Sequence, residues 1–421
     1  MEEKERIEKN NRIRQTLIET RQRRVNQRCL VYELKINTSK LSKKDFLKLK
    51  GMFVECKWLY NYLLNLELKD WNNVKRNIYS YDKDKNKIER TLTIPSKMIQ
   101  DVRNILKQNL KSLHNKKEKG KHKVGKLRFK SEYNSIELSQ YGITHKIHGN
   151  KIKVEGIKRH LKVFGLEQIK PEYEIANAKL IQKPSGYYIK LTCFENLTNK
   201  RLQKPIKEVG LDFGIKTHIT TSDNEQFSVT IEESEHLKGL QKKLFRQQKG
   251  SNNRYKTIQK IRREYEKLSN LKKDKCNKLV NYLCTTYSTI YMQDEMIVGW
   301  HKGLFGKQVQ HSCLGQLKGK LSKQNNVRII DKSYPTTKLC YNCGTLHKDI
   351  TLNDRTFICP TCGFSEERDL KAAKTILFIG QCKNTYVPVE RRNTTVERMS
   401  DFLSSYEQRK QSSTKQEATN L

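Results

Sequence analysis

The chain has 421 residues, which is long enough for two or three domains. Lys and Arg number 85 and Asp and Glu number 45, so the formal net charge is +40. Such an excess favours a polyanionic partner, because each phosphate that a cation neutralises releases condensed counterions. It makes a basic enzyme without a nucleic-acid role the weaker alternative. Ribosomal or membrane-surface binding would also explain the charge, so the charge indicates a class of partner and no activity.

Hydropathy and cysteine usage indicate the compartment. No apolar run approaches the roughly 20 residues that cross a bilayer, and the charged N-terminus lacks the apolar core of a secretory signal. Eleven cysteines are present, of which seven are scattered, and this odd remainder argues against a disulfide framework. We therefore expect a protein of the reducing cytoplasm with no membrane partner. The abundance of Lys, Asn and Ile suggests a bacterial source.

The N-terminal half combines a β-rich module with helices. Residues 1–28 form a charged arm, and from Cys29 the apolar residues alternate as on one face of a strand. Residues 41–125 contain two helical regions and end in a basic segment, which we interpret as a helical insertion. Short alternating segments follow, so residues 29–40 and 126–200 together predict a β-rich module that resembles a small barrel.

The C-terminal half has the order of a ribonuclease H-type α/β core, which we assign to residues 205–381. A strand ends at Asp212, and a long basic helical hairpin covers residues 237–287. The segment STIYMQDE predicts the next strand, residues 312–321 a helix, VRIIDKS another strand, and ERDLKAAKTIL the start of a terminal helix. The tail, residues 382–421, is polar and is predicted to be disordered.

Three acids lie at the edges of these elements. Asp212 ends an apolar strand between two glycines, Glu295 ends the strand after the hairpin, and Asp369 lies in the first turn of the terminal helix. In a strand, residues 293 and 295 share a face, so Gln293 is a neighbour of Glu295 in the same cleft. Carboxylates of this kind can hold two Mg²⁺ ions about 4 Å apart, which is the arrangement that hydrolyses phosphodiesters.

Four further cysteines form the most specific local pattern. Cys340, Cys343, Cys359 and Cys362 are two CxxC pairs separated by fifteen residues. Four thiolates at this spacing can close a tetrahedral Zn²⁺ site with no open position for water, so the predicted role is structural. The segment that carries the four cysteines, which we call the zinc ribbon, occupies residues 336–366. His347 is predicted to be an exposed loop residue rather than a ligand.

The motifs VGLDFGIK, IYMQDEMIVGWHK, CYNC…CPTC and ERDLKAAKTIL, in that order, resemble TnpB. This family comprises RNA-guided endonucleases encoded by bacterial insertion sequences and is related to compact type V CRISPR nucleases. The resemblance covers about residues 29–379. It implies an α+β multidomain protein with a RuvC-like nuclease domain carrying an inserted zinc ribbon, plus a wedge module with a recognition insertion.

The resemblance also implies the chemistry and the partners. Asp212, Glu295 and Asp369 correspond to the catalytic, Mg²⁺-binding acids, with Mn²⁺ as a substitute, and the four cysteines correspond to the ligands of one Zn²⁺. The partners would be a guide RNA derived from the transposon end and double-stranded DNA, which is cut beside a short target-adjacent motif. The protein would act as a monomer in a nucleoid-associated ribonucleoprotein linked to transposition.

The second acid leaves an alternative open. The commoner family pattern is a Glu-Asp-Leu run, and aligning its Asp with Asp294 puts Gln293 in the catalytic position. A Gln there would resemble the nuclease-inactive relatives that bind guided DNA as repressors. A transposase that joins DNA ends would share the three acids, but a four-cysteine ribbon just before the third acid fits TnpB better.

Overall fold

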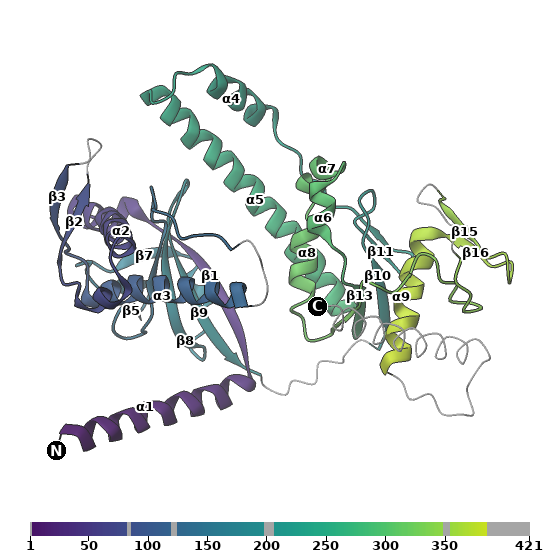
Figure 1. Cartoon of the computed structure of the whole chain (residues 1–421), viewed down its shortest axis with the longest axis horizontal. Coiled ribbons are helices and arrows are strands. Elements are labelled where there is room, and N and C mark those ends of the chain that lie inside the picture. Colours follow the sequence, from purple (N-terminus) through teal and green to yellow (C-terminus); the bar gives the residue numbers. More distant parts are fainter. Residues whose placement is uncertain (1, 82–85, 119–123, 198–205, 348–353, 385–421) are drawn as a thin grey trace. The chain divides into compact units, whose positions relative to one another are not determined.

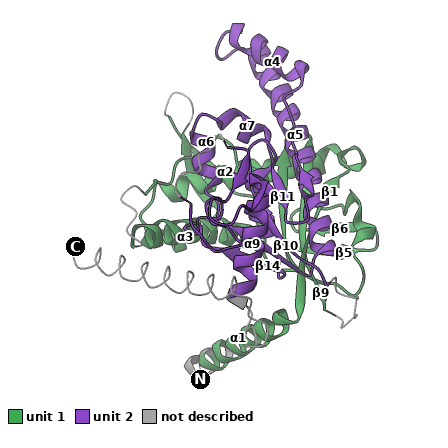
Figure 2. Cartoon of the chain, turned by 90° about the vertical axis from the view of Figure 1, so that its right-hand side faces the viewer, with its two compact units in different colours: residues 1–200 green, residues 201–421 purple. Residues whose placement is uncertain are grey.

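The computed structural model describes residues 2–81, 86–118, 124–197, 206–347 and 354–384 (Figure 1). The chain divides into two compact units, residues 1–200 and residues 201–421, which Figure 2 shows in separate colours. Each unit is described by itself. Within these ranges no helix combines the length and the apolar character that crossing a bilayer requires. The expected polar tail lies outside the described residues from residue 385 onward.

Unit 1 is built on a seven-stranded antiparallel sheet of near-barrel form. Its strands follow the order β4 (Ser135–Leu138), β8 (Glu174–Lys183), β9 (Gly186–Asn196), β1 (Gln27–Ile36), β7 (Leu161–Phe164), β6 (Lys151–Val154) and β5 (His145–His148). The central strand β1 buries Leu34 and Ile36 and exposes Lys35 between them, as the alternating sequence predicted. The expected β-rich module is therefore present, and β1 begins two residues before Cys29.

The helices α2 (Lys43–Leu64) and α3 (Ser96–Glu118) complete the core of unit 1, whereas α1 (Glu2–Val25) is largely exposed. Segments of 3-10 helix lie at Thr38–Lys40, Leu68–Asn73 and Leu166–Gln168. The Ser42 hydroxyl accepts a hydrogen bond from the backbone N–H of Asp45 at 3.1 Å and so caps α2. The apolar faces of α2 and α3 share one hydrophobic cluster with the sheet. A hairpin of β2 (Asn77–Tyr81) and β3 (Lys87–Thr91) interrupts the region expected to be helical.

Unit 2 contains a five-stranded mixed sheet in the order β12 (Gln226–Phe227), β11 (Ile219–Thr221), β10 (Glu208–Asp212), β13 (Thr289–Gln293) and β14 (Val327–Ile330). The first three strands pair antiparallel, whereas β10, β13 and β14 run parallel. Parallel strands are buried on both faces, and four of the five residues of β13 are buried accordingly. The carboxyl ends of β10, β13 and β14 meet at one edge of the sheet.

In the described part of unit 2, six helices and a second small sheet accompany this core. The predicted basic hairpin is present as α4 (Glu235–Arg246) and α5 (Asn252–Thr286), which Figure 1 labels. The others are α6 (Ile297–Lys302), α7 (Gly306–His311), α8 (Leu314–Leu321) and α9 (Arg368–Asn384). The ribbon contributes β15 (Thr356–Ile358) and β16 (Ser365–Glu367), which pair antiparallel directly before α9.

Two glycines let α9 lie directly against the sheet. A Cβ on Gly210 of β10 would fall 2.1 Å from the carbonyl oxygen of Ala373, and one on Gly380 would fall 2.1 Å from the ring of Tyr291. Both separations are far below van der Waals contact, so a larger residue at either position would push the helix away from the strands. The close contact at Gly210 is made by the backbone of α9. It fixes α9, which carries Asp369, on the strand that carries Asp212.

Candidate active site

Asp212 is the last residue of β10, at the carboxyl edge of the parallel strands. Its carboxyl group is enclosed by protein, although the residue keeps some exposed surface. Burial raises the pKa of Asp212 to about 8, and the negative charges of Asp369 and Glu295 add to the rise. The charges of the other two predicted acids therefore both act on the carboxyl group of Asp212.

Glu295 reaches this edge from a turn and not from a strand. β13 ends at Gln293, and the backbone N–H of Glu295 donates to the carbonyl of Gln293 at 2.9 Å. The expectation that residues 293 and 295 share a strand face is therefore wrong, because the chain turns between them. Burial raises the pKa of Glu295, Lys318 opposes that rise, and Asp294 adds to it.

Lys318 of α8 determines how the Asp294–Glu295 turn is held. Its ammonium group donates to the Asp294 carboxylate at 2.5 Å and to the backbone carbonyl of Glu295 at 2.6 Å. The side chain of Asp294 is 57% exposed and points to this cation. Asp294 is thus paired with a cation of α8, whereas the negative charge of Glu295 contributes to the raised pKa of Asp212.

Asp369 lies in the first turn of α9, as predicted. Its carboxylate accepts from the guanidinium of its neighbour Arg368 at 3.3 and 3.4 Å. A negative side chain at a helix N-terminus is stabilised by the helix dipole. The charge of Arg368 also lowers the pKa of Asp212, so this cation offsets part of the repulsion in the cluster.

Gln293, the alternative second residue, is buried and uses its amide elsewhere. The Nε2 group donates to the carbonyls of Tyr334 at 2.8 Å and Asp331 at 3.2 Å. The Oε1 atom accepts from the hydroxyl of Thr336 at 2.9 Å. Both N–H groups and the oxygen therefore bond to the segment that leads into the ribbon. The side chain whose charge acts on Asp212 is Glu295, not Gln293.

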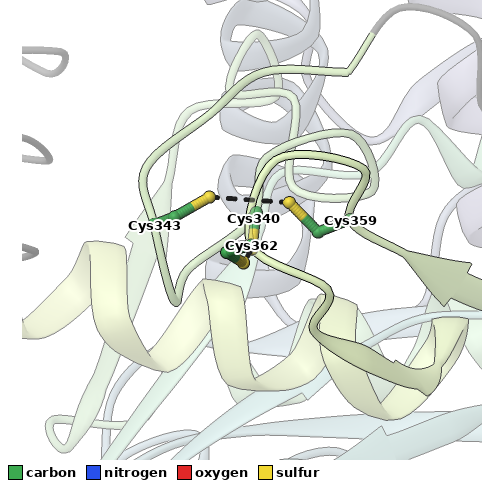
Figure 3. A group of neighbouring side chains, drawn as sticks. All are labelled: Cys340, Cys343, Cys359 and Cys362. Carbon is green, nitrogen blue, oxygen red and sulfur yellow. Dashed lines mark hydrogen bonds between the residues drawn. The ribbon is translucent and has the colours of Figure 1, made fainter.

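The four cysteines of the ribbon converge as predicted (Figure 3). All four sulfur atoms lie within 4.8 Å of one another, and the closest pairs are Cys343–Cys359 at 3.5 Å and Cys340–Cys362 at 3.9 Å. A tetrahedral zinc with Zn–S bonds of about 2.3 Å requires sulfur pairs about 3.8 Å apart. The donor set and its spacing thus fit one Zn²⁺. Among the described residues, this is the one group of three or more Cys, His, Asp or Glu side chains tight enough to share a single ion.

His347 departs from its predicted exposed position. It is buried, its Nε2 atom lies 3.1 Å from the sulfur of Cys359, and its ring packs edge-on against Phe357. No periodicity of apolar residues around His347 indicates this burial. Histidine here supports a thiolate from outside the set of four sulfurs, which is the usual position of a residue that orients a metal ligand.

Sequence reasoning singled out Gln293 but missed the cations around the acids. Arg368 and Lys318 are adjacent to or in contact with predicted site residues, but in so basic a chain their position in sequence did not single them out. Lys371, two residues after Asp369, is completely buried. A lysine in the middle of an apolar helical stretch was the available signal, because lysine is almost never fully buried without a specific partner.

Comparison with known proteins finds two family models that match parts of this chain. A family model described as "Probable transposase" matches residues 191–299, which include Asp212 and Glu295. A second, described as "Cas12f1-like, TNB domain", matches residues 313–376, which include the four cysteines and Asp369. Over these two stretches the chain, whose second unit has a mixed α/β fold, is similar to the transposase and Cas12f1-like families.

Two curated relatives make the resemblance more specific. A Streptomyces pristinaespiralis protein named "Putative RNA-guided DNA endonuclease" is 27% identical over 203 residues, which are 46% of this chain and 50% of that protein. The Escherichia coli K12 protein "Putative RNA-guided DNA endonuclease InsQ" is 24% identical over 230 residues, 49% of this chain and 57% of that protein. The chain thus spans about half the length of the curated relatives it matches. These matches confirm the resemblance to the TnpB family.

Proposed function

We propose that this protein is an RNA-guided DNA endonuclease of an insertion sequence, with a ribonuclease H-like, RuvC-type nuclease domain in residues 205–381. The observation that carries the proposal is the coupling of Asp369 and Glu295 to the carboxyl group of Asp212. Like charges gathered at a sheet edge destabilise the fold unless something positive binds there. Perturbed carboxyl groups of this kind are concentrated at catalytic sites.

The donor chemistry fits two Mg²⁺ ions, with Mn²⁺ as a substitute. Mg²⁺ takes oxygen ligands and retains several waters, so three carboxylates can serve a pair of ions. When bound, the two ions activate the attacking water and stabilise the leaving oxygen of the phosphodiester. Asp212, Glu295 and Asp369 would hold them, and Arg368 and Lys318 hold Asp369 and the Glu295 turn in place.

The helical hairpin of unit 2 supports a nucleic-acid partner. Residues 236–263 contain ten Lys and Arg residues and no acid. The apolar residues Leu237, Leu240 and Leu244 face Ile261 and Leu268 between the two helices. Phe245 lies off that face and is 92% exposed beside Arg246. An exposed aromatic ring among many cations is a common surface for phosphate contact and base stacking.

Further parts of the proposal follow from the resemblance and from the names of the relatives. The guide RNA would derive from the transposon end, and the DNA would be cut beside a short motif. Residues 29–40 and 126–200 would be the wedge module, with residues 41–125 as the recognition insertion. The protein would act as a monomer within a cytoplasmic, nucleoid-associated ribonucleoprotein, and base pairing would read the target sequence.

The alternative, a nuclease-inactive guided repressor, would require Gln293 in the second catalytic position. Three hydrogen bonds engage that amide with Asp331, Tyr334 and Thr336. Breaking them to reach a metal would leave buried polar groups unsatisfied, at about 1–3 kcal/mol each. We therefore favour the endonuclease, in which Gln293 has a different role.

The test is plasmid cleavage by the assembled complex. The protein is co-expressed with the noncoding DNA that flanks its gene, and the purified complex receives a matched target beside a randomised motif with Mg²⁺. Cleavage that requires RNA and is abolished by Asp212→Ala, with guide RNA still bound, is the expected result. Asp274→Ala, at an exposed acid of α5, is the matched control. Cleavage surviving Asp212→Ala would contradict the assignment, and motif-dependent binding without cleavage would support the repressor.

A further inference from the structure

One short segment connects the two halves of the acid cluster. Residues 331–337, here called the linking segment, run from the end of β14 to the ribbon and reach Cys340 three residues later. Tyr334 and Thr336 within it are both buried. Backbone N–H groups of the segment bond within it, Tyr334 to the carbonyl of Asp331 at 3.3 Å and Thr336 to that of Tyr334 at 2.9 Å. These turns aim successive carbonyl groups outward to the neighbouring elements.

Gln293 holds the linking segment from the side of β13. Its three hydrogen bonds take the carbonyls of Asp331 and Tyr334 and the hydroxyl of Thr336. Only an amide supplies two N–H donors and one acceptor from a single planar group. Gln293 is two residues before Glu295, and the backbone N–H of Glu295 bonds to the carbonyl of Gln293. A shift of the segment is therefore transmitted directly to the turn that carries Glu295.

Lys371 holds the same segment from the side of α9. Its ammonium group donates to the carbonyls of Thr336 at 3.0 Å and Thr337 at 2.9 Å. It also lies 4.1 Å from the ring centre of Phe357, a buried residue of the ribbon. Lys371 is two residues after Asp369, about 200° round the helix, so the two side chains leave α9 in different directions.

Thr336 is the point at which the two contacts meet. Its hydroxyl bonds to Gln293 and its carbonyl to Lys371. A chain of buried hydrogen bonds therefore runs from the residue two before Glu295, through the linking segment, to the residue two after Asp369. Buried networks that are fully satisfied rigidify the groups they join, because every break leaves an unpaired polar group in protein.

We propose that Gln293 and Lys371 are positioning residues of the nuclease site, which set Glu295 and Asp369 relative to each other through the linking segment. This inference rests on the proposed function of the three acids. Neither side chain contacts substrate or metal in this scheme. Their role is to hold two carboxylates, which arrive on separate elements, at the spacing that a pair of ions requires. Lys371 and Phe357 also join this arrangement to the ribbon.

The first test uses Lys371→Met and Gln293→Leu in the complete guide-RNA complex. Lys371→Met keeps an unbranched apolar side chain and loses the donors, and Gln293→Leu keeps the approximate volume and loses the amide. We expect the single-turnover cleavage rate to fall about 10- to 100-fold, the usual effect of removing a residue that orients a metal ligand. The Mg²⁺ concentration for half-maximal rate should rise, with target affinity unchanged within about threefold. Lys323→Met and Gln226→Glu, at exposed positions, are the controls.

A second measurement covers the case in which a variant folds poorly or the complex does not cleave. Hydrogen exchange on the protein without nucleic acid should show faster exchange in peptides covering residues 331–337 and the start of α9 in Lys371→Met. Zinc content should remain at one ion per chain. Unchanged exchange in those peptides, or variants that cleave with the wild-type rate and Mg²⁺ dependence, would overturn the inference. Failure of the wild-type complex to cleave would instead contradict the proposed function. The exchange result would then decide whether Gln293 and Lys371 hold the linking segment.

Discussion

Acidic side chains have opposite surroundings in the two units. In unit 1, Glu174 accepts bonds from Arg23 at 3.0 Å and Arg24 at 2.8 Å. Burial alone would raise its pKa, but bonds from Arg23 and Gln27 and the nearby positive charges bring the pKa of Glu174 below its ordinary value. In unit 2, Asp212 has two acids nearby and a pKa raised to about 8.

The difference shows that the carboxylates of unit 1 stabilise the fold, whereas those at the sheet edge of unit 2 are available for chemistry. A basic chain has cations to spare, and unit 1 uses them to pair its sheet carboxylates. The carboxyl edge of the unit 2 sheet keeps three acids close enough to repel, although cations such as Lys318 and Arg368 lie within reach. A cluster that stays electrostatically unfavourable in the free protein is prepared for a positive ligand.

The largest effect should come from Glu295→Gln, compared with its neighbour Asp294→Asn. The charge of Glu295 acts on Asp212, whereas Asp294 is paired with Lys318 at the surface. Removing the charge of Glu295 should reduce guided cleavage by about 10³-fold or more, because a lost ligand removes charge stabilisation in the transition state. Asp294→Asn should cost less than about tenfold. Single-turnover kinetics measure both, and equal losses would contradict the assignment of Glu295.

Next in size is the loss of zinc from Cys343→Ser, with Cys29→Ser as control. Cys343 lies 3.5 Å from Cys359 in the cluster, and Cys29 is an exposed cysteine of unit 1. The purified variant should hold well under one zinc per chain, and the ribbon should become sensitive to protease, because structural zinc supplies folding energy directly. Metal analysis reports the content. A full equivalent of tightly bound zinc in Cys343→Ser would exclude the four-thiolate site.

A smaller effect concerns stability as a function of pH. Folding raises the pKa of Asp212 to about 8 from an ordinary value of 3.8, so the folded state binds the additional proton between those values. The stabilisation this gives is present at low pH and is lost as pH rises toward 8. In Mg²⁺-free buffer at pH 8, Asp212→Asn should therefore have a higher melting temperature than wild type and a free energy of unfolding larger by at least about 1 kcal/mol. This difference in stability should become smaller toward pH 5. Calorimetry that shows a lower melting temperature for the variant at pH 8 would contradict the like-charge cluster.

The smallest effect is expected in unit 1, from Glu174→Gln. This removes the charge that Arg23 and Arg24 share, at a cost of about 1 kcal/mol or less because the group is partly exposed. Denaturant unfolding should show this loss while guided cleavage changes less than about threefold. A variant with greater stability than wild type would show that the carboxylates of unit 1 are not stabilised by their pairing, and the contrast between the units would be lost.

Periodicity predicted the elements whose burial is regular. The alternation of β1, the apolar content of β13 and the leucine spacing of the α4–α5 hairpin all appear in the structure as expected. The β2–β3 hairpin was missed because its strands are five residues long, polar and mostly exposed, which leaves little pattern to detect. The end of β13 was also misplaced, since nothing in Gln-Asp-Glu distinguishes a strand from a turn.

Spacing and element edges singled out the acids and the thiols, but their partners are tertiary facts. The acceptors of Gln293 are 38 and 41 residues away in the chain. Those of Lys318 are 23 and 24 residues away, and those of Lys371 are 34 and 35 residues away. Such pairings depend on how the strands are ordered in the sheet, and the sequence around each residue does not predict that order. The same limit explains His347, whose burial depends on the closing of the ribbon around Phe357.

The glycine contacts of α9 have a consequence for protein synthesis. The three acids come from stretches separated by 83 and 74 residues, and the last arrives on the helix that lies against Gly210. A ribosome that stalls or terminates before residue 368 releases a product with the near-barrel unit and the basic hairpin but without the third carboxylate. Under the proposed function, such truncated products would keep the basic hairpin but lack a complete site for cutting nucleic acid, so an interrupted round of translation would not release an active nuclease.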